Sequence, residues 1–142
     1  EERLKHIEDR QALQDVLYAY CKAVDKMTDL DAVMGFFTQD AVFDVTGIGL
    51  PRFKGHDAIR GFFAQVFGNM THHGLYITNF AIDKLDDGEA FCSNYTIGNG
   101  RSKEGHIIQA FLKYSIHLVL TPSGWKMTSF VQDPVMPIPE AI

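Results

Sequence analysis

Residues 108–118, with the sequence IQAFLKYSIHL, decide the fold class of this chain. Every second residue of this stretch, beginning with the first, is apolar, whereas polar residues such as Lys113 and His117 interrupt the alternate positions. Successive side chains of a β-strand point to opposite faces, so this alternation predicts a long strand with one buried and one wetter face. We expect the strand to extend over about residues 105–120.

Further strands are expected on both sides of this one, because short apolar runs are bounded there by turn-forming residues. The expected strands are residues 41–45, 73–84, 89–98 and 124–132, and the separating turns or loops are Asp86–Gly88, Gly98–Gly100 and Pro122–Gly124.

Three helices are expected before the main run of strands. Residues 2–26 carry an apolar stripe at helical spacing that must be buried. A short second helix begins after the capping residues at 28–31, and a third opens at 54–57. The 142 residues therefore predict a single α+β domain, residues 1–142, in which a curved antiparallel sheet packs on three helices.

The composition excludes several classes of partner. The net charge is −5, and the 13 Lys and Arg residues are scattered singly, which argues against binding to nucleic acid or to an anionic membrane. No apolar run is long enough to span a bilayer, and the first residues do not resemble a signal peptide. Cys21 and Cys92 lie in apolar patterns and are expected to be buried free thiols rather than a disulfide, so we expect a cytoplasmic protein.

Two adjacent histidines, His72 and His73, lie at the start of the strand expected at 73–84 and are the leading candidates for chemistry. Strand alternation sends one ring to each face, so one of the two is expected to face a pocket, and we favour His73. Asp25 lies at the end of the first helix, where a carboxylate is disfavoured by the helix dipole and therefore does not serve as a cap. A carboxylate that fixes the tautomer of an imidazole makes an acid/base pair.

Other polar residues are weaker candidates. Tyr20 lies inside the buried stripe and is either a core residue or a hydroxyl group that acts on substrate. No spacing typical of a metal site is present, and no Gly-x-Ser-x-Gly nucleophile motif occurs. The residues expected to bind substrate are His72, Asn94, Tyr95, Tyr114 and Ser129.

Four stretches carry a family likeness: YAYCKAVD at 18–25, DAVMGFFTQDAVF at 31–43, FKGHDAIRGFF at 53–63 and LVLTPSGWKM at 118–127. Together they resemble the SnoaL-like group of the nuclear transport factor 2 superfamily. The resemblance implies a cone-shaped α+β barrel (a cystatin-like fold) around a deep pocket. It also matches Asp25 and His73 to the acid and the histidine of the dehydratase and dehydrochlorinase branches. Asn79 has the same strand parity as His73 and is expected to face the pocket as well.

The resemblance implies a lyase or isomerase without a cofactor, with dehydration as the leading reaction. His73 would take a proton from carbon of a small, apolar and possibly cyclic substrate, Asp25 would orient it, and Tyr20 would assist as a third catalytic residue. The alternative is a non-catalytic domain for ligand binding or subunit assembly, as in the small subunits of ring-hydroxylating dioxygenases. Hydrolysis of an epoxide ranks last, because Asp25 has no acidic partner. Relatives associate through the sheet, so a homodimer or homotrimer is expected.

Overall fold

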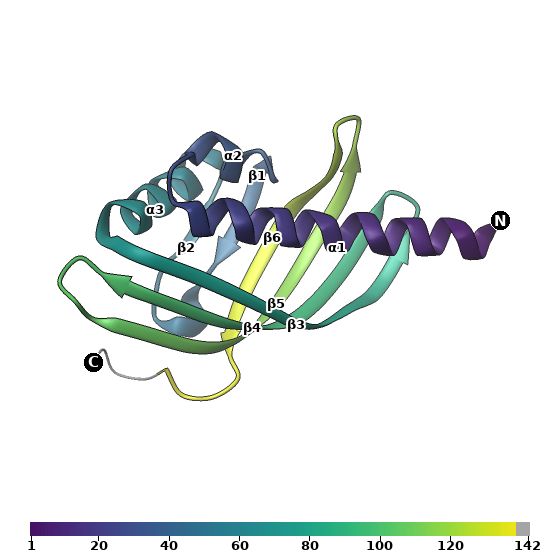
Figure 1. Cartoon of the computed structure of the whole chain (residues 1–142). Helices are drawn as coiled ribbons and strands as arrows, with labels where there is room; N and C mark the ends of the chain where they lie inside the picture. The colour runs from purple at the N-terminus through teal and green to yellow at the C-terminus, as the bar shows by residue number, and fades with distance from the viewer. Residues whose placement is uncertain (139–142) are drawn as a thin grey trace.

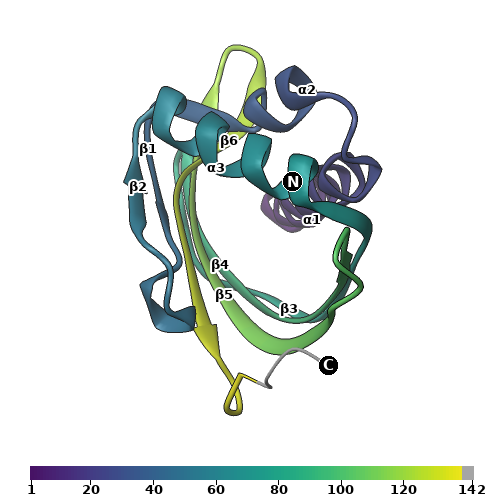
Figure 2. The same ribbon diagram turned by 90° about the vertical axis from the view of Figure 1, so that its left-hand side faces the viewer.

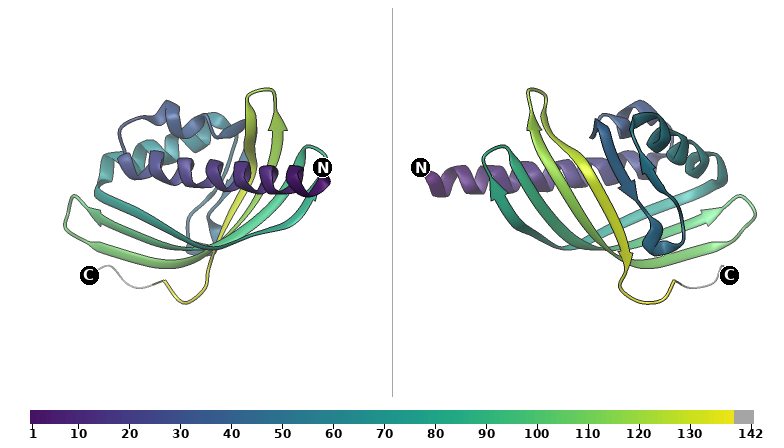
Figure 3. Two further views of the ribbon diagram at one scale, coloured as in Figure 1. Left: turned by 45° about the vertical axis from the view of Figure 1, so that its right-hand side comes forward. Right: turned by 180° about the vertical axis from the view of Figure 1, so that it is seen from behind.

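The computed structural model describes residues 1–138 and shows helices packed on a strongly curved sheet (Figure 1). The first helix, α1, crosses the strands, and its N-terminal end extends beyond them (Figures 1 and 3). The elements are, in chain order, α1 (Glu2–Lys26), α2 (Leu30–Met34), β1 (Phe37–Asp44), the 3-10 helix η1 (Thr46–Ile48), β2 (Arg52–Lys54), α3 (His56–Asn69), β3 (Met70–Asp86), β4 (Glu89–Ser102), β5 (Ile107–Thr121) and β6 (Gly124–Pro134).

The six strands form one sheet in the order β2-β1-β6-β5-β4-β3. The pairs β3–β4, β4–β5 and β5–β6 are antiparallel, as expected, whereas β1 runs parallel to β6. The sheet is therefore mixed rather than antiparallel throughout. The sheet curves towards the helices without forming a closed barrel (Figure 2). Residues of the sheet, of α1 and of α3 line a hollow on this concave side. The expected α+β architecture is confirmed, and none of the helices in residues 1–138 is long and apolar enough to cross a membrane.

The core lies between the helices and the concave face of the sheet. The apolar stripe of α1 is buried there as expected, with Leu17, Tyr20 and Val24 almost inaccessible to solvent. Aromatic rings fill one end of this core. Tyr20 and Phe130 lie with ring centroids 5.4 Å apart, and several further phenylalanines surround them. Offset and edge-to-face aromatic pairs of this kind add to the stability that burial of their area provides.

The loop expected at Gly98–Gly100 is instead part of β4, which continues to Ser102. Gly98 pairs with Ala110 and Gly100 with Ile108, and the chain reverses only at residues 103–106. Gly98 and Gly100 lie on the concave side, where side chains of β3 already occupy the space. A Cβ atom at Gly100 would clash with the terminal methyl group of Met70. The glycines of this strand therefore mark a close approach of neighbouring groups rather than a turn.

Register shifts in β6 and β3 change which residues face the hollow. In β6 the register shifts so that His117 pairs with Ser129 but Leu118 pairs with Met127. In β3 the register shifts between Thr78 and Ala81. Because a shift of one residue turns every later side chain to the opposite face, strict alternation fails in both strands.

Candidate active site

His73 and Asp25 lie in contact at one edge of the hollow. The Nδ1 atom of His73, near the start of β3, is 2.8 Å from Oδ1 of Asp25, near the end of α1. The second carboxylate oxygen accepts a hydrogen bond of 3.2 Å from the backbone N–H of Leu75. The side chains of His73 and Asp25 are 16% and 29% exposed, so the pair is partly shielded from water.

Local structure explains how these residues meet. The end of α1 is fixed by Met27, whose left-handed conformation (φ 54°) is stabilised by a hydrogen bond from its N–H to the carbonyl oxygen of Val24. Asp25 is thus placed where the helix dipole disfavours a negative charge. The hydrogen bonds from His73 and Leu75 offset this unfavourable position, because both strengthen with the charge on the acceptor.

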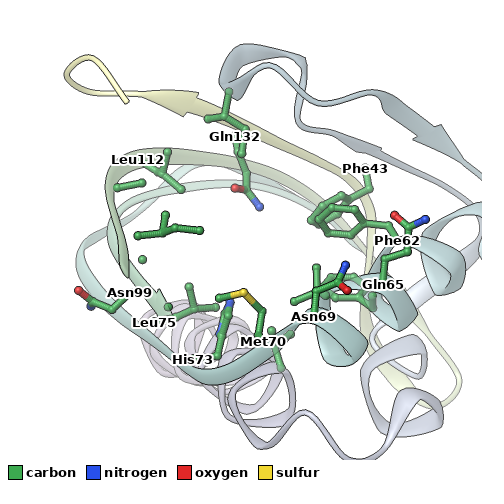
Figure 4. A pocket seen from close by; sticks show the side chains of 18 of the residues that line it. Phe43, Phe62, Gln65, Asn69, Met70, His73, Leu75, Asn99, Leu112 and Gln132 are labelled. Atoms are coloured by element: carbon green, nitrogen blue, oxygen red, sulfur yellow. The ribbon is translucent and has the colours of Figure 1, made fainter. Parts of the chain in front are cut away.

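The pairing fixes the tautomer of the neutral imidazole. An ionised carboxylate can only accept, so Nδ1 of His73 carries the hydrogen and Nε2 carries the lone pair. Within residues 1–138, no hydrogen-bond partner of Nε2 is found, and Figure 4 shows the ring reaching into the cavity beside Met70 and Leu75. The geometry therefore presents an unoccupied basic nitrogen to whatever fills this space.

The cavity has a volume of about 360 Å³, at the small end of the range for sites that bind small molecules. Apolar and aromatic side chains from the sheet, from α1 and from α3 form most of its wall (Figure 4). Among residues 1–138, no Asp, Glu, Lys or Arg lines it. The polar lining residues are Tyr20, Gln65, Asn69, His73, Asn99, Tyr114 and Gln132.

Tyr20 and Tyr114 both line the cavity from buried positions, and each is 2% exposed. Burial raises the pKa of both hydroxyl groups well above the ordinary value of 10.0. Both groups therefore stay protonated at neutral pH and are suited to donate hydrogen bonds rather than to give up a proton. The catalytic role expected for Tyr20 remains a prediction, and its position at the cavity is compatible with it.

The structure separates the two histidines. His72 points away from the cavity, is exposed, and lies with Nδ1 2.9 Å from the hydroxyl oxygen of Thr71. It lines a neighbouring groove of about 880 Å³, which also includes Asp25, His73 and Arg101. His73 is thus the histidine that faces the cavity; it lines both the cavity and the groove, whereas Asp25 lines the groove only.

Four other residues that were expected at the pocket lie outside the cavity wall. Tyr95 is 48% exposed on the outer face of the sheet, because the odd positions of β4 point outward. Ser129 is turned to the outer face by the bulge in β6, and the bulge in β3 likewise leaves Asn79 exposed with φ 55°. Asn94 is buried on the inner face but points its amide at the hydroxyl group of Thr96 and does not line the cavity.

Gln132 is the main cavity residue that the sequence analysis missed. It is 8% exposed and reaches the cavity from β6, where strict alternation from Trp125 and Met127 predicts an outward direction. The same bulge that excludes Ser129 brings Gln132 inward. Asn69 and Gln65, on the last turns of α3, were also missed, because polar residues near a helix end normally face water.

The chain matches a known family of domains. Residues 5–131 match the SnoaL-like domain. The chain belongs to the SnoaL-like family. No curated protein matches its sequence.

Among solved structures, a candidate aromatic ring hydroxylase from Novosphingobium aromaticivorans is 44% identical to this SnoaL-like chain, with a TM-score of 0.92 over 96% of this chain and 94% of that one. A candidate scytalone dehydratase from the same organism shares the fold at 14% identity, with a TM-score of 0.85 over 96% and 92% of the two chains. A hexachlorocyclohexane dehydrochlorinase from Novosphingobium barchaimii does so at 18% identity, with a TM-score of 0.81 over 94% and 91%.

Proposed function

We propose that this SnoaL-like protein is a lyase or isomerase that uses His73 to take a proton from carbon of a small neutral substrate. The observation that carries the proposal is the free Nε2 atom of His73, held towards an uncharged cavity by the bond from Nδ1 to Asp25. A base placed and oriented in this way contributes about 10²–10⁴-fold to a proton transfer. Structural neighbours named as dehydratases and dehydrochlorinases agree with this class of reaction.

For a dehydration, His73, Asp25 and a tyrosine that lines the cavity supply every group that the reaction needs. Nε2 takes the proton from carbon, the carbon–carbon double bond forms, and the carbon–oxygen bond to the leaving hydroxyl group breaks. Asp25 stabilises the resulting imidazolium without taking its proton. The imidazolium then gives the proton to the departing oxygen, which leaves as water. Tyr20 serves as a hydrogen-bond donor to the developing negative charge, since burial keeps it protonated.

A second candidate is a non-catalytic role in binding or assembly. The 44% identical relative is named for ring hydroxylation, and the small subunits of ring-hydroxylating dioxygenases are non-catalytic members of this fold. Within residues 1–138, no group of three or more His, Cys, Asp or Glu side chains could hold a metal ion. This candidate assigns no task to the contact between His73 and Asp25. Loss of a chemical rate on mutation of His73 would therefore favour the catalytic proposal over the binding role.

The test measures dehydration and deuterium incorporation for a panel of neutral cyclic β-hydroxyketones in D₂O by NMR. We expect His73→Ala to lower the rate by about 10²–10⁴-fold. The adjacent His72→Ala is the matched control, because that ring points outward, and its rate should stay near that of the unmodified protein. Equal rates for the unmodified protein and His73→Ala would refute the assignment of the base.

A further inference from the structure

The cavity wall opposite His73 carries a polar group that the proposed reaction does not use. Gln132 projects from β6 into the cavity, and Figure 4 shows its amide group facing the side on which His73 lies. Gln132 as a whole residue is only 8% exposed, but its amide atoms are not among the side-chain atoms sealed from solvent. No hydrogen bond of this amide to another described residue is found, so its donors and acceptor are open to whatever occupies the cavity.

Tyr114 is the neighbour that shares this wall. It pairs directly with Gln132 across β5 and β6, and residues paired in this way project side by side from one face of a sheet. Both side chains line the cavity. The wall therefore offers a protonated hydroxyl group together with an amide that can donate and accept. This combination matches a hydroxyl or carbonyl oxygen on a ligand.

The absence of charge from the cavity wall limits the ligand further. In the part of the chain that the structure describes, no Asp, Glu, Lys or Arg lines the cavity, and Asp25 contacts the Nδ1 side of His73 without lining it. A carboxylate or ammonium group on the ligand would lose its water without gaining a partner of opposite charge close to Gln132. The far wall is thus suited to a neutral polar group and unsuited to an ion.

We propose that Gln132 determines specificity by binding a neutral oxygen substituent at the end of the ligand remote from His73. The ligand class is an uncharged compound with an apolar, ring-sized middle and a hydrogen-bonding oxygen at each end. This inference rests on the proposed function only in placing the ligand beside His73. The role of Gln132 is tested through ligand affinity. It can therefore fail while the proposed reaction stands, and the proposed reaction can fail while the role of Gln132 stands.

The probes are 2-naphthol, 2,6-dihydroxynaphthalene and 6-hydroxy-2-naphthoate, with dissociation constants measured by calorimetry. In the unmodified protein we expect the diol to bind about threefold to tenfold more tightly than 2-naphthol, which is the range for one added neutral hydrogen bond. The carboxylate should bind at least about tenfold more weakly than the diol. Gln132→Leu should bring the ratio of the diol to 2-naphthol close to one while 2-naphthol still binds.

Gln39→Leu is the matched control, since it makes the same change at an exposed site outside both cavities and should leave that ratio unchanged. If Gln132→Leu does not fold, the side-chain amide NMR signals of Gln132 in the unmodified protein give the answer. They should shift more with 2,6-dihydroxynaphthalene than with 2,6-dimethylnaphthalene. The proposal is overturned if the diol has no advantage in the unmodified protein, if Gln132→Leu keeps that advantage, if the carboxylate binds as well as the diol, or if the amide signals respond equally to both ligands.

Discussion

Asp25→Asn is the most informative single substitution, because the contacts of Asp25 dictate how the introduced amide must lie. The N–H of Leu75 needs an acceptor, so the amide oxygen takes the place of Oδ2 and the amide NH₂ group faces His73. Nδ1 of His73 must then accept rather than donate, which moves its hydrogen to Nε2. The nitrogen that faces the cavity would no longer be a base.

The cost in stability is small compared with the loss of function. Two charge-assisted hydrogen bonds become neutral ones, which costs about 1 kcal/mol each. Removing a carboxylate from the end of α1 returns roughly 0.3–1 kcal/mol. Partial exposure of the pair reduces the net loss in the free energy of unfolding to about 1 kcal/mol. In a chain of this size, such a loss lowers the melting temperature by about 2–4 °C. The loss of the base should reduce the rate by about 10²–10⁴-fold.

Three measurements separate these effects. Long-range ¹H–¹⁵N NMR spectra report the tautomer of His73 without any substrate, thermal unfolding reports stability, and the dehydration assay reports rate. Asp15→Asn makes the same substitution at an exposed site of α1 and should leave all three unchanged. The reasoning is refuted if the folded Asp25→Asn protein keeps the hydrogen on Nδ1 of His73, or if it retains the full rate.

The remaining predictions concern stability. Gly47→Ala should destabilise the protein by about 1–3 kcal/mol, since its Cβ would lie 2.7 Å from the carbonyl oxygen of Gln132 and 3.2 Å from Cα of Asp133. Gly61→Ala, in the middle of α3 with nothing within 4 Å, should instead stabilise by about 0.5–1 kcal/mol in the same urea titration; a loss there would contradict the packing. Burial raises the pKa of the Cys21 thiol from 9.0 to about 12, so the unfolded chain ionises first and stability falls as the pH rises from 9 towards 12. Cys21→Ala should remove about 1.4 kcal/mol of the loss between pH 8 and pH 10, and an unchanged pH slope would count against a buried thiol.

Much of the fold was predictable from local patterns. The apolar stripe of residues 2–26 and the alternation at 108–118 are repeated over enough residues to define α1 and β5. The parallel pairing of β1 with β6 was not predictable, because it joins segments far apart in the chain. The Gly98–Gly100 stretch was misassigned to a loop: it continues β4, and Gly100 leaves room for the side chain of Met70 rather than forming a turn.

For the candidate site, the sequence determined which groups could do chemistry: an imidazole that strand parity sends to one face or the other, and a carboxylate placed where a helix disfavours it. Only the tertiary structure decided that His73 and not His72 faces the cavity and meets Asp25 at 2.8 Å. It also decided that Gln132 and not Ser129 completes the opposite wall. The physical reason that Gln132 replaces Ser129 is the bulge in β6, where one extra residue turns the later side chains of the strand to the opposite face.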